Sequence, residues 1–361
     1  MITSLNICNF KCFERLDVDF GQLTLLTGFN SGGKSSALQP LLLLAQAMRA
    51  GGFPVKKFPL NGKFVRLGSV GDVIPMGSRS EAVDFTVSTK TESRRWTLRA
   101  RPGERSLSFS SSSGQTHEGG DDQSVFSSLR RLSFIGAVRQ ATPDDYPVPD
   151  LDSGARDVGA DGRYAAFEYN RFADEAVLEE RRHSDSGGHT VRKVIDEWMS
   201  WLFPGAGVNV QFFSHLSLLN LQFRTSEFGE WRRPANVGYG YSYAFPIVVA
   251  LVTARVGQTI VIDSPEAHLH PRAQSRMGWL LAKFAQAGVQ VVVESHSDHV
   301  LNGMRLAVHD GALNHQLIKV IFFAGEMGAA KVFPLIVDKD GGINRWPEGF
   351  FDQMEHDLSR L

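Results

Sequence analysis

The chain has 361 residues, of which 42% are hydrophobic and 21% are charged, and its net charge is −1. This composition is typical of a globular protein, and the length allows a sizeable core. The near-zero net charge excludes the class of nucleic-acid-binding proteins that are basic over their whole length. It does not exclude a local basic patch.

The first half of the chain is expected to be rich in short strands. Apolar and alternating segments predict strands at 2–8, 16–20 and 23–28, and an antiparallel hairpin or meander within 81–110. Residues 34–50 predict a helix, in which Pro40 predicts a kink or a displaced start. The polar segments 108–124 and 141–162 predict loops.

The second half predicts alternating helices and strands. The helical pattern of 163–203 ends at Pro204 and Gly205. The segments TIVID (259–263) and VQVVVE (289–294) are apolar and β-branched, which is typical of central parallel strands covered on both faces. The other expected elements are strands at 208–213, 216–223, 317–323 and 331–337, and helices at 242–255, 272–287, 298–309 and from 348 onward.

Two features indicate a cytoplasmic protein without membrane association. The N-terminal sequence lacks the basic and long apolar regions of a signal peptide, and the longest apolar stretch, LLLLAQAM, is too short to cross a bilayer. The two cysteines, Cys8 and Cys12, are expected to be reduced and packed, because a metal site would need further ligands nearby.

The segment GFNSGGKS, from Gly28 to Ser35, fits the phosphate-loop pattern between an apolar strand and an apolar helix. Its glycines let successive N–H groups point inward, and the helix that follows adds its own N–H groups and positive dipole end. Lys34 is expected to place a charge on the β- and γ-phosphates, and the Ser35 hydroxyl is expected to bind Mg²⁺. The alternative is a glycine turn followed by a surface lysine.

A phosphate loop alone does not identify the reaction, because kinases, GTPases and motor ATPases share it. Asp263 ends a buried strand, and a carboxylate at such an edge can hold Mg²⁺ through water. His296 follows the next strand and is a candidate γ-phosphate contact, with an ordinary loop histidine as the alternative.

Together these segments resemble the ABC-type P-loop ATPase heads of the RecF, SMC and OLD (overcoming-lysogenization-defect) group, and most closely its small prokaryotic AAA-labelled members, whose C-terminal segment has no assigned function. The resemblance covers nearly the whole chain. Its motifs are NFKCF (9–13), GFNSGGKSS (28–36), LNGxxVRLG (60–68), NVGYGYS (236–242), IDSPEAHLHP (262–271), ESHSDH (294–299) and WPEGFFD (346–352).

The resemblance implies an α/β fold with a mixed or parallel central sheet, helices on both faces, an antiparallel β-subdomain and an inserted helical lobe. The expected parts are an N-terminal half of the head (1–110), the inserted lobe (111–235) and a C-terminal half of the head (236–361). The family's heads close as homodimers around two ATP molecules with Mg²⁺. The implied nucleotide-binding residues are Lys11, Gly28, Asn30, Ser31, Gly32, Gly33, Lys34, Ser35, Ser36 and, facing the partner's γ-phosphate, Gly238, Gly240 and Ser242. Ser242 is also expected to cap the helix that follows.

One departure from the family concerns the catalytic base. Where transporter and SMC heads have a glutamate after the metal-binding Asp, this chain has Ser264, which is not a strong base at neutral pH. Glu266 is the preferred candidate, Glu294 is the alternative, and slow or absent hydrolysis remains open. His268 and His270 could suggest a metal pair, but they fall where the family's D-loop crosses the dimer interface.

The leading functional hypothesis is an ATPase that transmits ATP-driven closure to a separately encoded effector, such as a nuclease in phage defence or DNA maintenance. The 62 residues after His299 lack the clustered acidic motifs of a nuclease of the OLD type. The alternative hypotheses are a RecF-like DNA clamp and a nucleotide-sensing switch with little hydrolysis. A metabolic kinase is a remote third alternative. A clamp needs a basic groove, for which the candidate residues are Arg94, Arg95, Arg99, Arg101, Arg105, Arg130, Arg131, Arg181 and Arg182.

Overall fold

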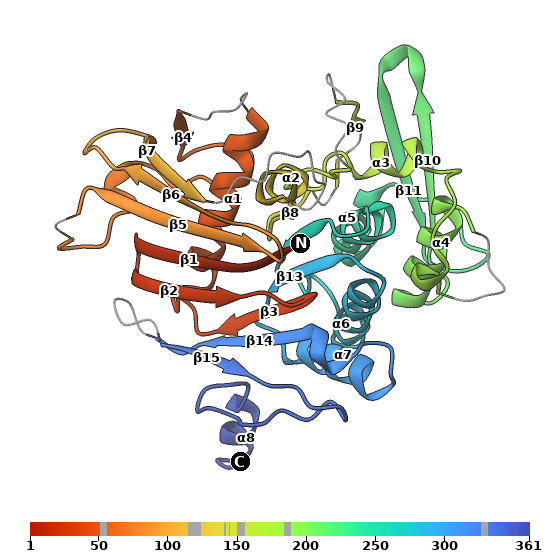
Figure 1. Cartoon of the computed structure of the whole chain (residues 1–361). Helices are drawn as coiled ribbons and strands as arrows, with labels where there is room; N and C mark the ends of the chain where they lie inside the picture. The colour runs from red at the N-terminus through yellow and green to blue at the C-terminus, as the bar shows by residue number, and fades with distance from the viewer. Residues whose placement is uncertain are drawn as a thin grey trace. The chain divides into compact units, whose positions relative to one another are not determined.

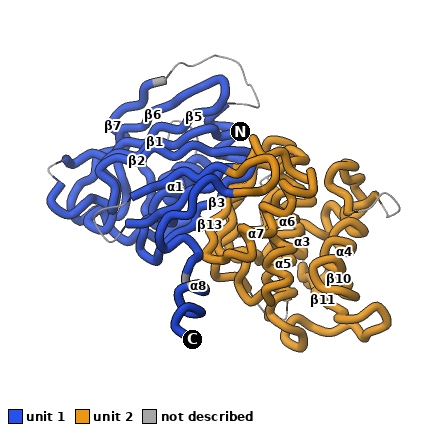
Figure 2. The backbone as a smooth tube through the Cα atoms, turned by 90° about the horizontal axis from the view of Figure 1, so that it is seen from below, with its two compact units in different colours: residues 1–132, 319–336, 343–361 blue, residues 133–318, 337–342 orange. Residues whose placement is uncertain are grey.

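The computed structural model describes residues 1–50, 56–78, 80–114, 124–140, 142–143, 145–149, 156–183, 189–325 and 331–361 (Figure 1). The chain forms two compact units, which Figure 2 shows in different colours. Unit 1 comprises 1–132, 319–336 and 343–361, and unit 2 comprises 133–318 and 337–342. Each unit is described by itself. The expected division at residues 110 and 235 stays a prediction.

Unit 1 contains an antiparallel sheet of six strands in the order β2-β1-β5-β6-β7-β4. Side chains of β5 alternate between buried and half-buried, as expected for a sheet with one face against the core. The bounds are β1 Ile2–Phe10, β2 Phe13–Asp19, β4 Lys57–Pro59, β5 Ala82–Thr89, β6 Ser93–Arg99 and β7 Ser106–Gly114.

The long helix α1 (Lys34–Ala50) is the centre of unit 1 and contacts β1, β3 (Leu23–Gly28), β4 and α2 (Val125–Arg131). Most of its side chains are buried, which explains why its sequence is apolar on nearly every face. Pro40 lies inside α1, and the helix still begins at Lys34 as expected. Beside β3 lie β14 (Ile318–Phe323) and β15 (Val332–Leu335), in the order β15-β14-β3, and α8 spans Gln353–Leu358.

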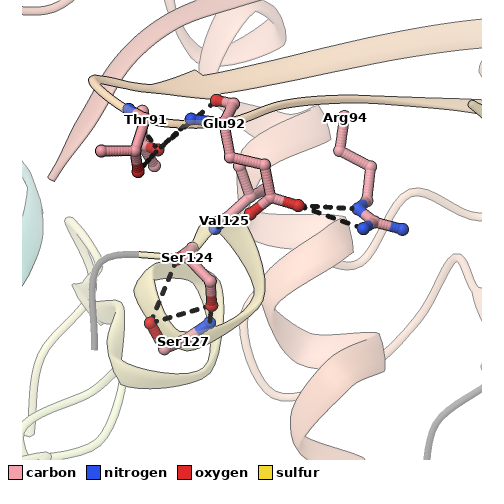
Figure 3. A network of polar contacts seen from close by, with 7 residues as sticks. Thr91, Glu92, Arg94, Ser124, Val125 and Ser127 are labelled. Carbon is pink, nitrogen blue, oxygen red and sulfur yellow. Dashed lines mark hydrogen bonds and ion pairs between the residues drawn. The ribbon is translucent and has the colours of Figure 1, made fainter. Parts of the chain in front are cut away.

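A buried ion pair connects the antiparallel sheet of unit 1 to α2 (Figure 3). The Arg94 guanidinium donates to one oxygen of Glu92 at 3.0 Å, while the other oxygen accepts the Val125 N–H at 2.9 Å. Arg94 also lies over the ring of Phe126. Arg94 therefore stabilises the core of unit 1 and cannot belong to a basic groove for DNA.

Arg181, in unit 2, is likewise buried, and it donates a hydrogen bond to the carbonyl of Ala254. The expectation that these arginine runs form exposed basic surface is thus wrong for Arg94 and Arg181.

Unit 2 contains a parallel sheet in the order β13-β12-β8, with α5 packed against β12 and α6 against β13. The expectation that 259–263 and 289–294 form buried parallel strands is confirmed, with the second strand beginning at residue 290. The bounds are β8 Ser133–Ile135, β12 Thr259–Asp263, β13 Gln290–Glu294, α3 Ala165–Arg171, α4 Val191–Leu202, α5 Tyr239–Thr253, α6 Pro271–Gln286 and α7 Asp298–His309.

A second, antiparallel sheet of unit 2 has the order β10-β11-β9. Strands β10 (Gly207–Phe213) and β11 (Leu218–Arg224) form a long hairpin, and β9 is short (Tyr146–Pro147). Figure 1 shows the hairpin tip extending beyond α3 and α4. Within the described ranges, the 3₁₀ helices are η1 Val70–Asp72, η2 Glu179–Arg181, η3 Ser214–Leu216, η4 Pro234–Asn236 and η5 His315–Leu317.

Several element boundaries differ from those expected. The segment 108–114 belongs to β7, because serines there pair with β6 in spite of their polar character, while the rest of that expected loop, 115–123, lies outside the described residues. Helix α5 begins three residues earlier than expected, and α8 begins at residue 353 instead of 348. Among the described residues, no helix is long and apolar enough to cross a membrane.

Candidate functional site

The phosphate loop leaves β3 through a backbone that only glycine can follow. Gly28 has a φ of +136°, and a Cβ there would lie 2.1 Å from the carbonyl oxygen of Phe323. The Gly32 N–H donates to the carbonyl of Phe29 at 3.1 Å, and the Ala37 N–H donates to Gly33 at 2.8 Å as α1 begins. The loop is thus compact and closely packed against the end of β14.

Lys34 is only 3% exposed, and its ammonium donates to the carbonyls of Gly28 at 3.0 Å and Phe29 at 2.7 Å. The charge is therefore held beneath the loop at the N-terminus of a 17-residue helix, whose dipole also favours an anion. The side chains of Asn30, Ser31 and Ser35 are exposed. A buried lysine, a helix N-terminus and exposed hydroxyls are the groups that a polyphosphate with its Mg²⁺ requires.

The turn between β1 and β2 packs against the phosphate loop. A Cβ on Gly33 would lie 3.2 Å from the Sγ of Cys12 and 2.7 Å from the ring of Phe13. Burial raises the pKa of the Cys12 thiol, although a hydrogen bond with Ser36 opposes the shift. Lys11 lies in the same turn with a φ of +54°, and burial lowers the pKa of its ammonium. The structure thus brings the NFKCF turn and the phosphate loop together.

In unit 2, the carboxyl ends of β12 and β13 place Asp263 opposite Glu294. The Ser264 N–H donates to the carbonyl of Glu294 at 2.8 Å, and its hydroxyl donates to the Asp263 carboxylate at 2.9 Å. Ser264 has a φ of +50°, which turns the chain sharply away from the strand. Asp263 is half-buried, whereas Glu294 is 5% exposed.

Glu266 joins the segment after β12 to the segment after β13. One carboxylate oxygen accepts the Ser295 hydroxyl at 2.8 Å, and the other accepts the backbone N–H of His296 at 2.9 Å. The His296 side chain is exposed. Two candidates that are thirty positions apart in the sequence therefore lie side by side, and Glu266 fixes the backbone that carries His296.

Arg139 is a central residue of this edge that the sequence interpretation missed. It is buried, and it donates to the carbonyls of Asp263 at 2.5 Å, Ser264 at 3.0 Å and Tyr243 at 3.5 Å. Burial lowers the pKa of Arg139 to about 10, which the nearby carboxylates of Asp263 and Glu266 oppose, so it is charged at neutral pH. One signal could have found it: Arg139 lies four positions after the short apolar strand β8, which pairs with the strand that ends in Asp263.

The GYGYS segment begins a helix, as expected, but the residue that caps the helix is not the expected one. Gly238 is the N-cap of α5, and Gly240 and Ser242 lie inside the helix. The expectation that Ser242 caps this helix is therefore wrong, because Tyr239 to Tyr241 already adopt helical geometry. Ser242 is 3% exposed, and its hydroxyl has no hydrogen-bond partner among the residues that the structure describes.

His268 and His270 have structural contacts within unit 2. The ring of His268 packs on Tyr243, with ring centroids 4.4 Å apart, and on Tyr239 at 5.6 Å. His270 caps α6 by accepting the Arg272 N–H at 3.3 Å. In the described part of the chain, no group of three or more His, Cys, Asp or Glu could hold a metal ion. The two histidines therefore have packing and capping roles in this structure.

Comparison with known proteins gives two family matches. A family model described as "AAA domain, putative AbiEii toxin, Type IV TA system" matches residues 23–302. A second model, described as a protein of unknown function (DUF3696), matches residues 313–361.

Among curated proteins, the Old nuclease of Escherichia phage P2 is 20% identical over 340 residues, which cover 85% of this chain and 58% of the nuclease. The chain thus spans less than two-thirds of the length of that relative.

Two solved SMC heads share the fold. An SMC head bound to the winged-helix domain of ScpA has a TM-score of 0.56 at 16% identity, covering 94% of this chain and 98% of the head. An SMC head with an extended coiled coil from Pyrococcus furiosus, bound to the C-terminal domain of ScpA, has a TM-score of 0.57 at 12% identity and covers 100% and 99%. The expected P-loop NTPase fold of the ABC-ATPase head type is confirmed.

Proposed function

The chain belongs to the AAA-domain family whose model matches residues 23–302, and from this premise we propose that it binds ATP with Mg²⁺ and hydrolyses it. The observation that carries the proposal is Lys34, a nearly fully buried lysine whose ammonium lies under the glycine loop at the start of α1. Burying an ammonium is costly unless the site needs its charge, and a polyphosphate supplies that need.

In the proposed reaction Ser35 and Asp263 would hold the Mg²⁺, and Lys34 would bind the β- and γ-phosphates. When bound, the metal neutralises charge on the transferred phosphoryl group. Asn30, Ser31, Gly33 and Ser36 would contribute N–H and hydroxyl groups to the nucleotide, and Lys11 would add a charge beside the loop. Gly32 would line the site while its N–H closes the loop on Phe29.

Glu266 is the proposed base that orients and deprotonates the attacking water, with His296 contacting the γ-phosphate. The hydrogen bonds from Glu266 to Ser295 and His296 support the proposal, because they hold the carboxylate and the histidine backbone in one fixed relation. Ser264 has no such role, since its hydroxyl donates to Asp263. Glu294 remains the alternative base, and its deeper burial is the argument against it.

We further propose that two heads dimerise around ATP through the segment from Gly238 to Ser242, and that closure is passed to a partner protein. The two solved SMC heads, each with a bound ScpA domain, support the idea that this fold accommodates a separate partner. The similarity to the Old nuclease supports a nuclease as that effector, in phage defence or DNA maintenance.

The test is steady-state ATP turnover by the purified wild type beside Lys34→Ala, Glu266→Gln and Glu294→Gln, each with and without duplex DNA, with ATP binding measured in parallel. The proposal expects Lys34→Ala to lose binding. It expects Glu266→Gln to bind ATP but to lose turnover by about 10²- to 10⁴-fold. Loss of turnover in Glu294→Gln alone would move the base to Glu294.

Two outcomes would change the functional assignment. A wild type that binds ATP through Lys34 but never hydrolyses it would favour the nucleotide-sensing switch, for which Ser264 in the place of a catalytic glutamate is the supporting observation. A wild type that binds no ATP would refute the proposal altogether.

A further inference from the structure

The C-terminal turn WPEGFFD, residues 346–352, packs within unit 1 against the phosphate loop. Gly349 has a φ of +79°, and a Cβ there would lie 2.1 Å from the ring of Phe29, the second residue of the loop. The turn is closed by two hydrogen bonds, from the Gly349 N–H to the Asp352 carboxylate at 2.8 Å and from the Phe350 N–H to the Pro347 carbonyl at 3.0 Å. The backbone conformation therefore favours glycine, and a larger residue would also meet the far end of the Phe29 side chain.

A cluster of aromatic rings fixes this turn on β14. Phe350 is buried and packs edge-on against Phe322 with centroids 5.2 Å apart, and it also contacts Trp346 and Phe351, each at 5.0 Å. Phe322 in turn meets Phe29 at 5.8 Å. The turn and the loop thus share one support, the end of β14.

Residue 29 also determines where Lys34 lies. The Phe29 carbonyl accepts hydrogen bonds from the Lys34 ammonium and the Gly32 N–H, and the Phe29 N–H donates to Phe323 at 3.1 Å. A displacement of Phe29 would move the acceptor of the buried lysine together with one of the N–H groups of the loop. Side chains that hold Phe29 therefore hold the phosphate-binding groups.

We propose that Gly349 and the turn around it position the phosphate loop and thereby set its affinity for nucleotide. The proposal rests on the proposed ATP binding and adds a role for the C-terminal segment. Gly349 is a positioning residue: it acts through Phe29 and contacts no phosphate itself. The region matched by the family of unknown function thus becomes part of the nucleotide-binding machinery.

The experiment is a double-mutant cycle read by isothermal titration of ATP, with melting temperatures from the same samples. Gly349→Ala places a methyl group against Phe29. The matched control is Gly103→Ala, because Gly103 lies in unit 1 with a φ of +81° and a Cβ there would meet no described residue within 4 Å. Both variants place alanine at a similar positive φ, but only Gly349→Ala brings a methyl group against Phe29 of the phosphate loop. Phe29→Ala completes the cycle, since it removes the ring that Gly349 faces.

We expect Gly349→Ala to weaken ATP binding about tenfold relative to Gly103→Ala. In the Phe29→Ala background the same change should cost no more than Gly103→Ala does. Equal affinities of Gly349→Ala and Gly103→Ala would overturn the inference, and so would an equal loss with and without the Phe29 ring.

Two results separate this inference from the function on which it rests. If the wild type binds ATP and Lys34→Ala does not, a failure of the cycle refutes the positioning role alone. If the wild type binds no ATP, both proposals fall. If Gly349→Ala does not fold, the ATP affinity of Phe29→Ala alone tests the positioning role. That variant should fold, because the Phe29 side chain is 45% exposed. Unchanged ATP affinity in that variant would refute the positioning role.

Discussion

The Arg139 guanidinium donates a hydrogen bond to the main-chain carbonyl of Asp263 at 2.5 Å, although 124 positions separate the two residues. The same guanidinium reaches the carbonyls of Ser264 and, on α5, Tyr243. One buried side chain thus connects the end of β12, where the candidate metal ligand lies, to the helix that begins at the GYGYS segment.

Replacing Arg139 with alanine should lower the free energy of unfolding by about 3 kcal/mol, because several buried carbonyls would lose their donor. Urea unfolding checks the value. The matched control is Arg163→Ala, since Arg163 lies in the same unit and pairs with Asp161 at the surface, with its side chain 48% exposed. That control should cost less than about 1 kcal/mol. Equal losses in the two variants would show that Arg139 is not a structural connection.

Two substitutions of Glu266 should separate its chemical role from its structural one. In Glu266→Gln the amide oxygen can still accept the His296 N–H and the amide N–H can donate to Ser295, so the free energy of unfolding should change by less than about 1 kcal/mol while turnover is lost. Glu266→Ala removes both hydrogen bonds and should destabilise by about 2 kcal/mol as well. A glutamine variant with normal turnover would exclude Glu266 as the base.

Gly238→Glu should abolish ATP-dependent dimerisation, because in the proposed dimer a carboxylate at this N-cap would face the phosphates of the partner's nucleotide. The position suits the test, since a Cβ there meets no described residue within 4 Å, whereas a Cβ on Gly240 would lie 3.0 Å from the His268 carbonyl. Light scattering with and without ATP reports the assembly, and Gly238→Ala serves as the uncharged control. A glutamate variant that dimerises as the alanine variant does would contradict the proposed dimer.

Alkylation of Cys12 should be slow at neutral pH and should accelerate as the pH rises. The thiolate is the reacting form, and burial raises the pKa of Cys12 above its ordinary value of 9.0, so the thiolate fraction grows about tenfold per pH unit until that raised pKa is reached. Mass spectrometry of a Cys8→Ser protein treated with iodoacetamide measures the rate.

Because the Cys12 sulfur lies beside Gly33, its alkylation should also weaken ATP binding. Cys12→Ser is the insensitive control. A labelled protein with unchanged ATP affinity would show that the turn does not support the loop.

Short-range sequence pattern was the most reliable guide to structure where it acts together with local geometry. The apolar strand, glycine loop and helix around Lys34 are adjacent in the chain, and the structure places them as expected. It was less reliable at boundaries that depend on pairing: the serines at 108–114 join β7 because β6 offers them partners, which their polarity did not indicate.

The sequence by itself determined the phosphate loop and the strands that end in Asp263 and Glu294, because these follow from residue types within a few positions of one another. The class of fold followed from the resemblance of several such motifs to a known family. The tertiary structure alone decided that Arg139 holds the end of β12, that Glu266 holds His296, that Arg94 and Arg181 are buried, and that Gly349 touches Phe29. Each of these contacts joins residues far apart in the chain. Strand order and helix packing determine which distant side chains come into contact. A local sequence pattern predicts neither of them.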